Sequence, residues 1–198
     1  MMGQKPNVQF VKALISYGTE YIDTGVAVDD TTIVHASLYI EAWNKAYDNL
    51  FGAPMNQFGA IRNLSRNEIG ILYKGKEGVS YGFPCTPPVE MDIVINASTN
   101  TATVNGTTRA ISGDYAFSDK PLWIFTKANI RGGVDVPGAF KLYSFTITKG
   151  GALVRDFVPA LDGAGTPCLY DMVSSTFFYN AGTGEFGYET LGGEVVNG

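Results

Sequence analysis

Residues 32–42 read TIVHASLYIEA, in which apolar and polar side chains alternate. Val34, Ala36, Leu38 and Ile40 occupy every second position. In a β-strand, residues two apart lie on the same face of the sheet. The spacing therefore predicts a strand with one face in a hydrophobic core and the other toward solvent.

The same period of two recurs along the chain, and turn signals separate the repeats. Asn105-Gly106 and Gly150-Gly151 are pairs that favour tight hairpins, because both central residues of a type I′ turn need a positive φ. Helical turns are expected only near Val11–Ser16 and Asp171–Ser175. Many short strands with glycine-rich turns predict an all-β, two-sheet antiparallel sandwich or jelly roll. Further strands are expected at Asn56–Ile61, Glu68–Lys74, Gly78–Phe83, Val89–Ala97, Thr101–Val104, Thr107–Ile111, Pro121–Thr126 and Ala139–Thr148.

Composition restricts the class of protein. Hydrophobic residues make up 45% and aromatic residues 13% of the 198 residues, which excludes a disordered chain. The net charge is −5 and the 14 basic residues are dispersed, so we expect no nucleic-acid partner. The N-terminus lacks the pattern of a signal peptide, and no apolar run approaches the roughly 20 residues that span a bilayer. We therefore expect neither secretion by a leader nor membrane insertion.

Two cysteines, Cys85 and Cys168, lie far apart in the sequence and lack the spacing of a zinc site. We expect two buried free thiols, because unpaired cysteine packs as a small hydrophobic residue. A single disulfide is the alternative.

Several segments together resemble a group of concanavalin A-like jelly-roll domains. These domains recur in tailed-phage structural proteins, in prophages and in surface proteins of gut bacteria. The resemblance covers roughly residues 14 to 187 and rests on these segments: GTEYIDTGV (18–26), LFGA (50–53), PLWIFTKAN (121–129), KLYSFTI (141–147), LVRDFVPALD (153–162) and CLYDMVSSTFFYNAGTGEF (168–186).

The resemblance implies a concanavalin A-like sandwich over residues 14–198, preceded by an N-terminal arm at residues 1–13 that docks onto a partner. Such domains serve glycan binding, adhesion or particle assembly, and sometimes glycan cleavage. We expect a non-enzymatic, virion-associated structural or adhesion protein that forms a homo-oligomer. Its expected partners are other virion proteins and cell-surface glycan. The alternatives are a bacterial carbohydrate-binding module and a divergent glycoside hydrolase.

Charged residues interrupt the apolar C-terminal strand LVRDFVPAL. Alternation places Leu153, Arg155 and Phe157 on one face, and Val154 and Asp156 on the other. A half-buried charge needs a partner. Asp171 either caps the turn that follows it or pairs with Arg155. We therefore expect Arg155, Asp156 and Asp171 to be structural.

The strand VEMDIVI matches two positions of the E-x-D-x-E motif of laminarinase-like glucanases. Glu90 and Asp92 occupy the first two positions, but Val94 replaces the third carboxylate. Retaining hydrolysis needs both a nucleophile and an acid. His35, the only histidine, is expected to be a surface residue. We expect no catalytic residues.

No cofactor-binding loop is present, and no cofactor or metal is expected. Asp135 and the loop at Val28–Asp30 are candidate calcium ligands, but solvated loop charges are the preferred interpretation.

Glycan binding requires exposed aromatic rings and planar polar groups. Trp43 and Tyr47, and likewise Asn129 and Arg131, lie in polar loops, and Tyr81 is a weaker candidate. Trp43 alternatively closes one end of the sandwich. Trp123, which has apolar neighbours on both sides, is expected in the core.

Overall fold

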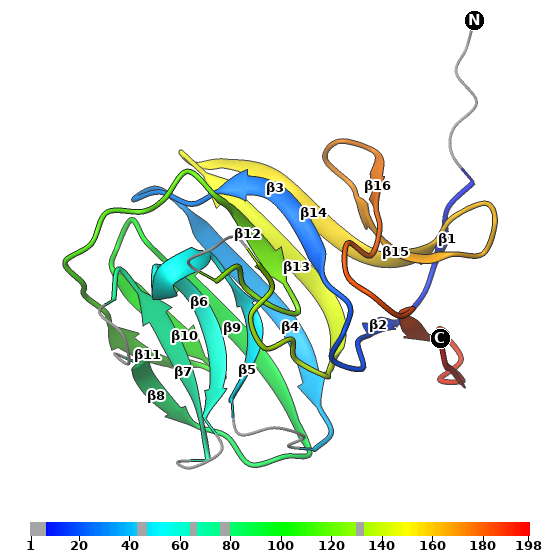
Figure 1. The fold of residues 1–198 in the computed structure, drawn as a ribbon, viewed down its shortest axis with the longest axis horizontal. Coiled ribbons are helices and arrows are strands. Elements are labelled where there is room, and N and C mark those ends of the chain that lie inside the picture. Colours follow the sequence, from blue (N-terminus) through cyan, green and yellow to red (C-terminus); the bar gives the residue numbers. More distant parts are fainter. Residues whose placement is uncertain (1–6, 43–46, 64–66, 76–79, 130–132) are drawn as a thin grey trace, which may run out of the picture.

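The computed structural model of the chain describes residues 7–42, 47–63, 67–75, 80–129 and 133–198. Two antiparallel β-sheets stack face to face (Figure 1). Within the described residues, the helical content is one 3₁₀ turn, η1 (Pro54–Asn56), and no helix is long and apolar enough to cross a membrane. The prediction of an all-β jelly-roll sandwich is confirmed.

The two sheets differ in width. The main path of the large, 12-stranded sheet is β11 (Thr107–Ala110), β10 (Thr101–Val104), β9 (Val89–Asn96), β4 (Ile33–Ile40), β13 (Lys141–Lys149), β14 (Ala152–Leu161), β15 (Pro167–Asp171) and β16 (Thr176–Phe178). Short strands β1 (Gln9–Phe10), β2 (Ala13–Ile15), β17 (Gly187–Glu189) and β18 (Val195–Val196) add to it. The 6-stranded sheet runs β3 (Ile22–Ala27), β12 (Pro121–Ile124), β5 (Tyr47–Gly52), β6 (Phe58–Asn63), β7 (Glu68–Tyr73) and β8 (Ser80–Pro84).

The alternation in residues 32–42 sets the register of the large sheet. Val34 of β4 pairs with Ile95 of β9 on one side and with Ile147 of β13 on the other. All three side chains are fully buried, so neighbouring strands direct their apolar residues toward the same core. A slip of one residue would turn this whole set toward solvent.

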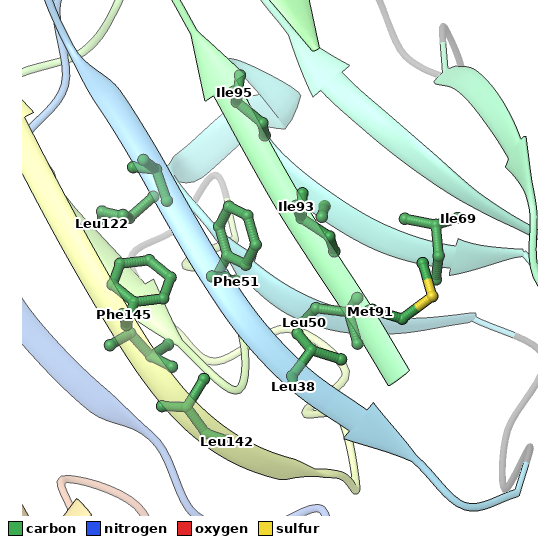
Figure 2. Packing of buried hydrophobic residues seen from close by; sticks show 14 of the residues in the cluster. Leu38, Leu50, Phe51, Ile69, Met91, Ile93, Ile95, Leu122, Leu142 and Phe145 are labelled. Atoms are coloured by element: carbon green, nitrogen blue, oxygen red, sulfur yellow. The ribbon is translucent and has the colours of Figure 1, made fainter. Parts of the chain in front are cut away.

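The core lies between the sheets, as Figure 2 shows. Leu38, Ile93 and Phe145 enter it from the large sheet, and Phe51 and Ile69 enter it from the small sheet. The rings of Phe51 and Phe145 meet edge to face at a centroid distance of 5.2 Å. This geometry places the positive edge of one ring against the negative face of the other.

Both predicted hairpins are present. Asn105 and Gly106 have φ angles of 46° and 78° and connect β10 to β11. Gly150 and Gly151 have φ angles of 59° and 81° and connect β13 to β14. Positive φ at both central positions matches the right-handed twist of the flanking strands, which explains the residue types found there.

The helical turn predicted at Val11–Ser16 is wrong. Ala13–Ile15 form β2, and Gln9–Phe10 form β1 against β14. Val11 is 5% exposed and its N–H donates to the carbonyl of Pro159. Residues 9–13 of the predicted arm therefore belong to the large sheet. The turn predicted at Asp171–Ser175 is present as a non-helical turn.

Trp123 does not lie in the core, contrary to the prediction. Its neighbours Leu122 and Ile124 are fully buried, so alternation turns the indole outward. There it is half-buried and stacks on Tyr21 with a centroid distance of 4.7 Å. Phe125 has a φ of 70°, which strand geometry does not allow, and β12 therefore ends before the predicted Thr126.

A bulge changes the predicted faces of β14. Arg155 pairs with Ile147, whereas Leu153 pairs with the adjacent Thr148, so Val154 is an extra residue. Val154 packs against the core, on the same side as Phe157. Simple alternation assigned these two to opposite faces and fails because a bulge shifts the period by one.

Truncation of Phe145 to alanine should lower the free energy of unfolding by about 3–5 kcal/mol, because it leaves a cavity opposite Phe51. Urea denaturation measures this loss. Thr146→Ala, at the next and partly exposed position of β13, should change stability by less than about 0.5 kcal/mol. Equal effects of the two substitutions would contradict the placement of the core.

Candidate functional site

The structure describes only part of the predicted glycan contacts. Trp43, Arg131 and the side chain of Tyr47 lie outside the described residues. The Tyr81 hydroxyl lies 2.9 Å from the carbonyl oxygen of Ser112 and accepts its N–H at 2.7 Å, which joins β8 to the loop after β11. Asn129 closes a short loop, because its side-chain oxygen accepts the N–H of Gly133.

Asp171 is fully buried at the end of β15. Its carboxylate accepts the N–H groups of Asp156, Val173 and Ser174, at 2.8 to 3.3 Å, and the Ser174 hydroxyl at 2.6 Å. It also lies 3.7 Å from the guanidinium of Arg155. The two roles that the sequence left open for Asp171, capping the turn and pairing with Arg155, are both present.

Arg155 links the two sheets. Its Nε donates to the carbonyl of Thr24 in β3, and its guanidinium lies over the ring of Phe178 in β16 at 5.4 Å. In the described part of the chain, the carboxylate of Asp156 has no hydrogen-bond or ion-pair partner, and this residue is held through its backbone. Arg155 and Asp171 therefore brace the strands, whereas the Asp156 side chain does not.

The carboxylates of β9 lie on the solvent face of the large sheet. Glu90 and Asp92 are exposed, and Asp92 is 2.7 Å from Nε2 of His35 on β4. Val94 sits opposite His35 in the register, where a glucanase would carry its third carboxylate. On this strand, Asp92 is therefore hydrogen-bonded to His35, and Val94 occupies the third position of the motif.

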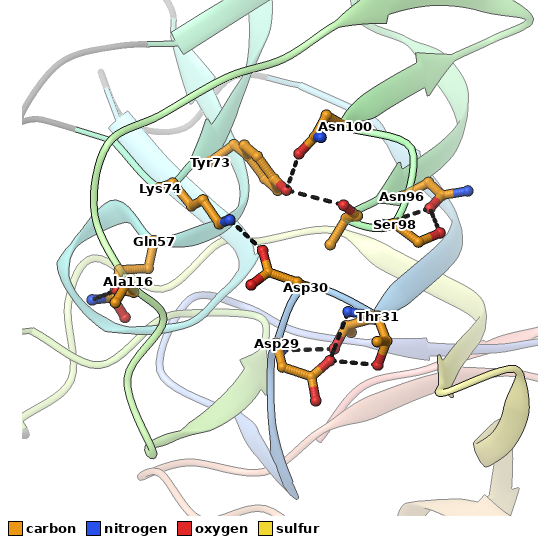
Figure 3. A network of polar contacts seen from close by, with 12 residues as sticks. Asp29, Asp30, Thr31, Gln57, Tyr73, Lys74, Asn96, Ser98, Asn100 and Ala116 are labelled. Carbon is orange, nitrogen blue, oxygen red and sulfur yellow. Dashed lines mark hydrogen bonds and ion pairs between the residues drawn. The ribbon is translucent and has the colours of Figure 1, made fainter.

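The candidate calcium ligands have lysine partners, and Figure 3 shows this for Asp30 and Lys74. Asp30 contacts Lys74, Asp29 lies 3.1 Å from Lys149, and Asp135 contacts Lys127. Burial acts to raise the pKa of Asp29, but hydrogen bonds from Thr31, Lys149 and Thr32 lower it to about 2. Among the described residues, no group of three or more His, Cys, Asp or Glu side chains is arranged to hold a metal.

Cys85 and Cys168 are free and buried, which confirms the expectation of two unpaired thiols. Burial raises the pKa of Cys85 to about 11 and that of Cys168 to about 12. Both remain protonated near neutral pH and are poor nucleophiles there.

A pocket of about 490 Å³ lies between residues 164–167 and residues 179–186, in the C-terminal part of the chain. The turn between β14 and β15 forms one wall, and the loop after β16 forms the other. This volume is within the range of small-ligand sites. The lining residues are Ala164, Gly165, Thr166, Pro167, Tyr179, Asn180, Gly182, Gly184, Glu185 and Phe186.

Tyr179 is the aromatic residue of this pocket that solvent reaches most, with 46% of its surface exposed. Its hydroxyl donates to Oδ2 of Asp162 at 3.0 Å. The other oxygen of Asp162 accepts the N–H groups of Ala164 and Thr166, both at 2.9 Å.

The N–H groups of Thr166 and Ala164 and the Tyr179 hydroxyl hold the pKa of Asp162 below its usual range. Burial and the adjacent Asp162 carboxylate raise the pKa of Tyr179 to about 12. A fixed hydroxyl–carboxylate pair therefore borders the pocket.

The opposite wall is also anchored by hydrogen bonds. Oδ1 of Asn180 accepts the N–H groups of Tyr21 and Gly182, and its Nδ2 donates to the carbonyl of Gly184. The N–H of Thr183 donates to the carbonyl of Thr19. The N-terminal segment GTEY and the C-terminal segment NAGTG are thus joined, and the loop that forms the pocket has a defined shape.

Glu20 stabilises the N-terminal side of this junction. Its buried carboxylate accepts the hydroxyls of Ser16 and Thr19 and the N–H groups of Tyr17 and Thr19. Burial acts to raise its pKa, but these hydrogen bonds outweigh burial and lower it. A second pocket, of about 420 Å³, lies on the other side of the 180–184 loop beside Tyr21.

The sequence analysis did not identify Tyr179 or this pocket. It used NAGTGEF only as part of the resemblance, and the hydrogen bonds of Asn180 in this segment are structural. The sequence FFYN contained a signal for Tyr179. Phe178 packs against the core, so alternation turns the next residue, Tyr179, away from it. The pocket itself depends on two turns about 15 residues apart in sequence coming together in space.

No protein-family model matches the chain, and no curated protein matches it. Among solved structures, it is similar to the crystal structure of a "putative carbohydrate binding protein" from Bacteroides ovatus, with a TM-score of 0.62 and 12% identity. The match covers 95% of this chain and 62% of that one. At this identity, the similarity establishes a shared fold and does not transfer binding residues.

Replacement of Asp171 by alanine should lower the free energy of unfolding by about 2–4 kcal/mol, because it leaves buried N–H groups and Arg155 without their acceptor. Urea denaturation is the measurement. Asp156→Ala should cost less than about 0.5 kcal/mol. If Asp156→Ala proved as costly as Asp171→Ala, the assignment of the brace to Asp171 would be wrong.

Glu20 should contribute to acid sensitivity. A carboxyl whose folded pKa is lowered stabilises the fold above its unfolded pKa of 4.5, and this contribution is lost as pH falls through the folded value. Stability measured by urea midpoints should therefore fall below about pH 4.5, and less steeply in Glu20→Gln. Glu90→Gln, at an exposed carboxylate, should keep the wild-type slope. An unchanged slope in Glu20→Gln would refute this role.

Proposed function

We propose that this protein is a non-enzymatic carbohydrate-binding module whose ligand occupies the pocket beside Tyr179. The single observation that carries the proposal is an exposed tyrosine ring at the border of a 490 Å³ pocket. Sugar rings have apolar faces that pack on aromatic rings and hydroxyls that bond to planar polar groups. Asp162, Thr166 and Glu185 supply such groups around the pocket.

The charge of this region favours a neutral ligand. From Asp156 to Gly198 the chain contains no lysine or arginine, but it contains six carboxylates. Asp162 is ionised near neutral pH, because its hydrogen bonds hold its pKa down. A uronic acid, a sialic acid or a sulfated sugar would bring a second negative charge beside Asp162, which has no lysine or arginine partner among the described residues. Neutral sugars carry no such penalty.

Two further observations support binding without catalysis. The fold resembles that of a protein described as carbohydrate-binding, and the glucanase-like strand carries Val94 and an Asp92 that is hydrogen-bonded to His35. The bacterial module is thus favoured over the virion protein as the main interpretation. Virion localisation, homo-oligomer formation and virion partners remain predictions from the sequence.

On an array of neutral, amino and acidic glycans, the isolated protein should bind neutral structures. Tyr179→Ala should weaken this binding by about tenfold or more, because the ring contact is lost. Tyr179→Phe should keep most of the binding, since it keeps the ring. Titration calorimetry with the strongest neutral hit gives the affinities.

Tyr115→Ala is the matched control, because Tyr115 is similarly exposed, at 49%, and lies far along the chain from the pocket. It should bind like the wild type. Thermal unfolding of each variant establishes that the fold is intact. Binding that survives Tyr179→Ala in a folded protein, or binding confined to acidic glycans, would contradict the proposal.

A further inference from the structure

Tyr179 is also one end of a row of four aromatic rings. Ring centroids are 6.1 Å apart between Tyr179 and Phe177, 5.1 Å between Phe177 and Tyr170, and 6.2 Å between Tyr170 and Phe10. The rings come from β16 and the residue after it, from β15 and from β1. The row therefore crosses the strands at the side of the large sheet where β1, β15 and β16 lie in Figure 1.

The row lies on the face of the sheet that points away from the core. Across β14 to β16, Leu169 and Phe178 belong to the main core, and their neighbours Tyr170 and Phe177 face the other way. Tyr170 and Phe177 form a separate small cluster with Ala160 and Cys168. The two ends of the row are open to solvent, with Phe10 at 41% and Tyr179 at 46% exposure.

We infer that the binding site continues from the pocket along this row, and that its ligand is a linear, neutral glycan chain of several sugar units. The inference rests on the proposed function and specifies the ligand class. A single sugar in the pocket contacts Tyr179 alone. A chain that leaves the pocket over Phe177 reaches Phe10 at the far end, and these two rings add apolar surface for further parts of the chain, whereas the buried Tyr170 supports them from below.

The groups beside the row suit an uncharged polar chain. Asn7 lies beside the turn that lines the pocket. A Cβ atom placed on Gly163 of this turn would be 3.6 Å from the Cβ atom of Asn7. Asn7, Thr166 and Thr176 are exposed and offer amide and hydroxyl groups. Sugar hydroxyls form hydrogen bonds with such groups without desolvating a charge.

A sugar chain fits the row better than a protein partner does. The cluster around the row contains few other apolar side chains, and Tyr170 in it is only 8% exposed. A stable protein interface covers about 800 Å² on each partner and needs a broad apolar centre. A narrow line of rings between polar groups instead matches the width of an extended polysaccharide.

The test is a series of neutral cello-, laminari- and xylo-oligosaccharides of two to six units, titrated into the full chain by calorimetry. In the best-bound series, affinity should rise with chain length by about tenfold or more between the shortest and longest members. Phe10→Ala should remove most of this rise and leave the affinity for the shortest member unchanged. Phe177→Leu, which keeps an apolar side chain but loses the ring, should also flatten it.

Leu153→Ala is the control, because Leu153 is an exposed apolar residue, at 47%, near the opposite end of β14. It should retain the full dependence on length, and thermal unfolding verifies that each variant is folded. Equal affinity at all lengths, abolished by Tyr179→Ala, would overturn the chain inference and leave the proposed function standing. Absence of binding to every series would overturn the chain inference, while the glycan array tests the proposed function separately. A dimer of the wild type that Phe10→Ala dissociates would assign the row to a second copy instead.

Discussion

The unequal width of the two sheets is the constraint on which the rest of this structure depends. The large sheet has twelve strands and the small sheet six. Where the sheets overlap, apolar side chains from both fill one core, as at the contact between Phe51 and Phe145. At β14 to β16 the large sheet also carries aromatic side chains on its second face, around Tyr170. Partly exposed rings are the consequence, and they supply the candidate binding surface.

Buried charges hold this part of the fold in place. Asp171 accepts backbone N–H groups of the turn between β15 and β16, and Arg155 joins that region to β3 of the small sheet. Glu20 and Asn180 do the same for the loops that meet near the C-terminus. A buried carboxylate that accepts several N–H groups is compensated for its loss of hydration, and it fixes loop geometry in return. These groups fix the positions of the loops, including those that form the walls of the pocket.

The proposed function assigns this surface to recognition. Its exposed elements are aromatic rings, hydroxyls, amides and carboxylates, of which Asp162 already accepts three hydrogen bonds. Both thiols are buried, with raised pKa values. No lysine or arginine follows Arg155 in the sequence, and of the six carboxylates from Asp156 onward, Asp171 is compensated by Arg155 and Glu189 by Lys12 and Lys141.

The sequence by itself determined the fold class, the main strands and the hairpins. Period-two alternation and Asn-Gly or Gly-Gly pairs act locally, so each stretch carries its own signal. It also singled out Arg155 and Asp171, because charges inside an apolar strand require partners. The outward face of Trp123 follows from alternation, because Leu122 and Ile124 face the core. The bulge at Val154 and the pocket beside Tyr179 were decided only by the tertiary structure. These features depend on which strands become neighbours and on how far one sheet extends past the other. The spacing of nearby residues encodes neither the strand neighbours nor the extent of the sheets.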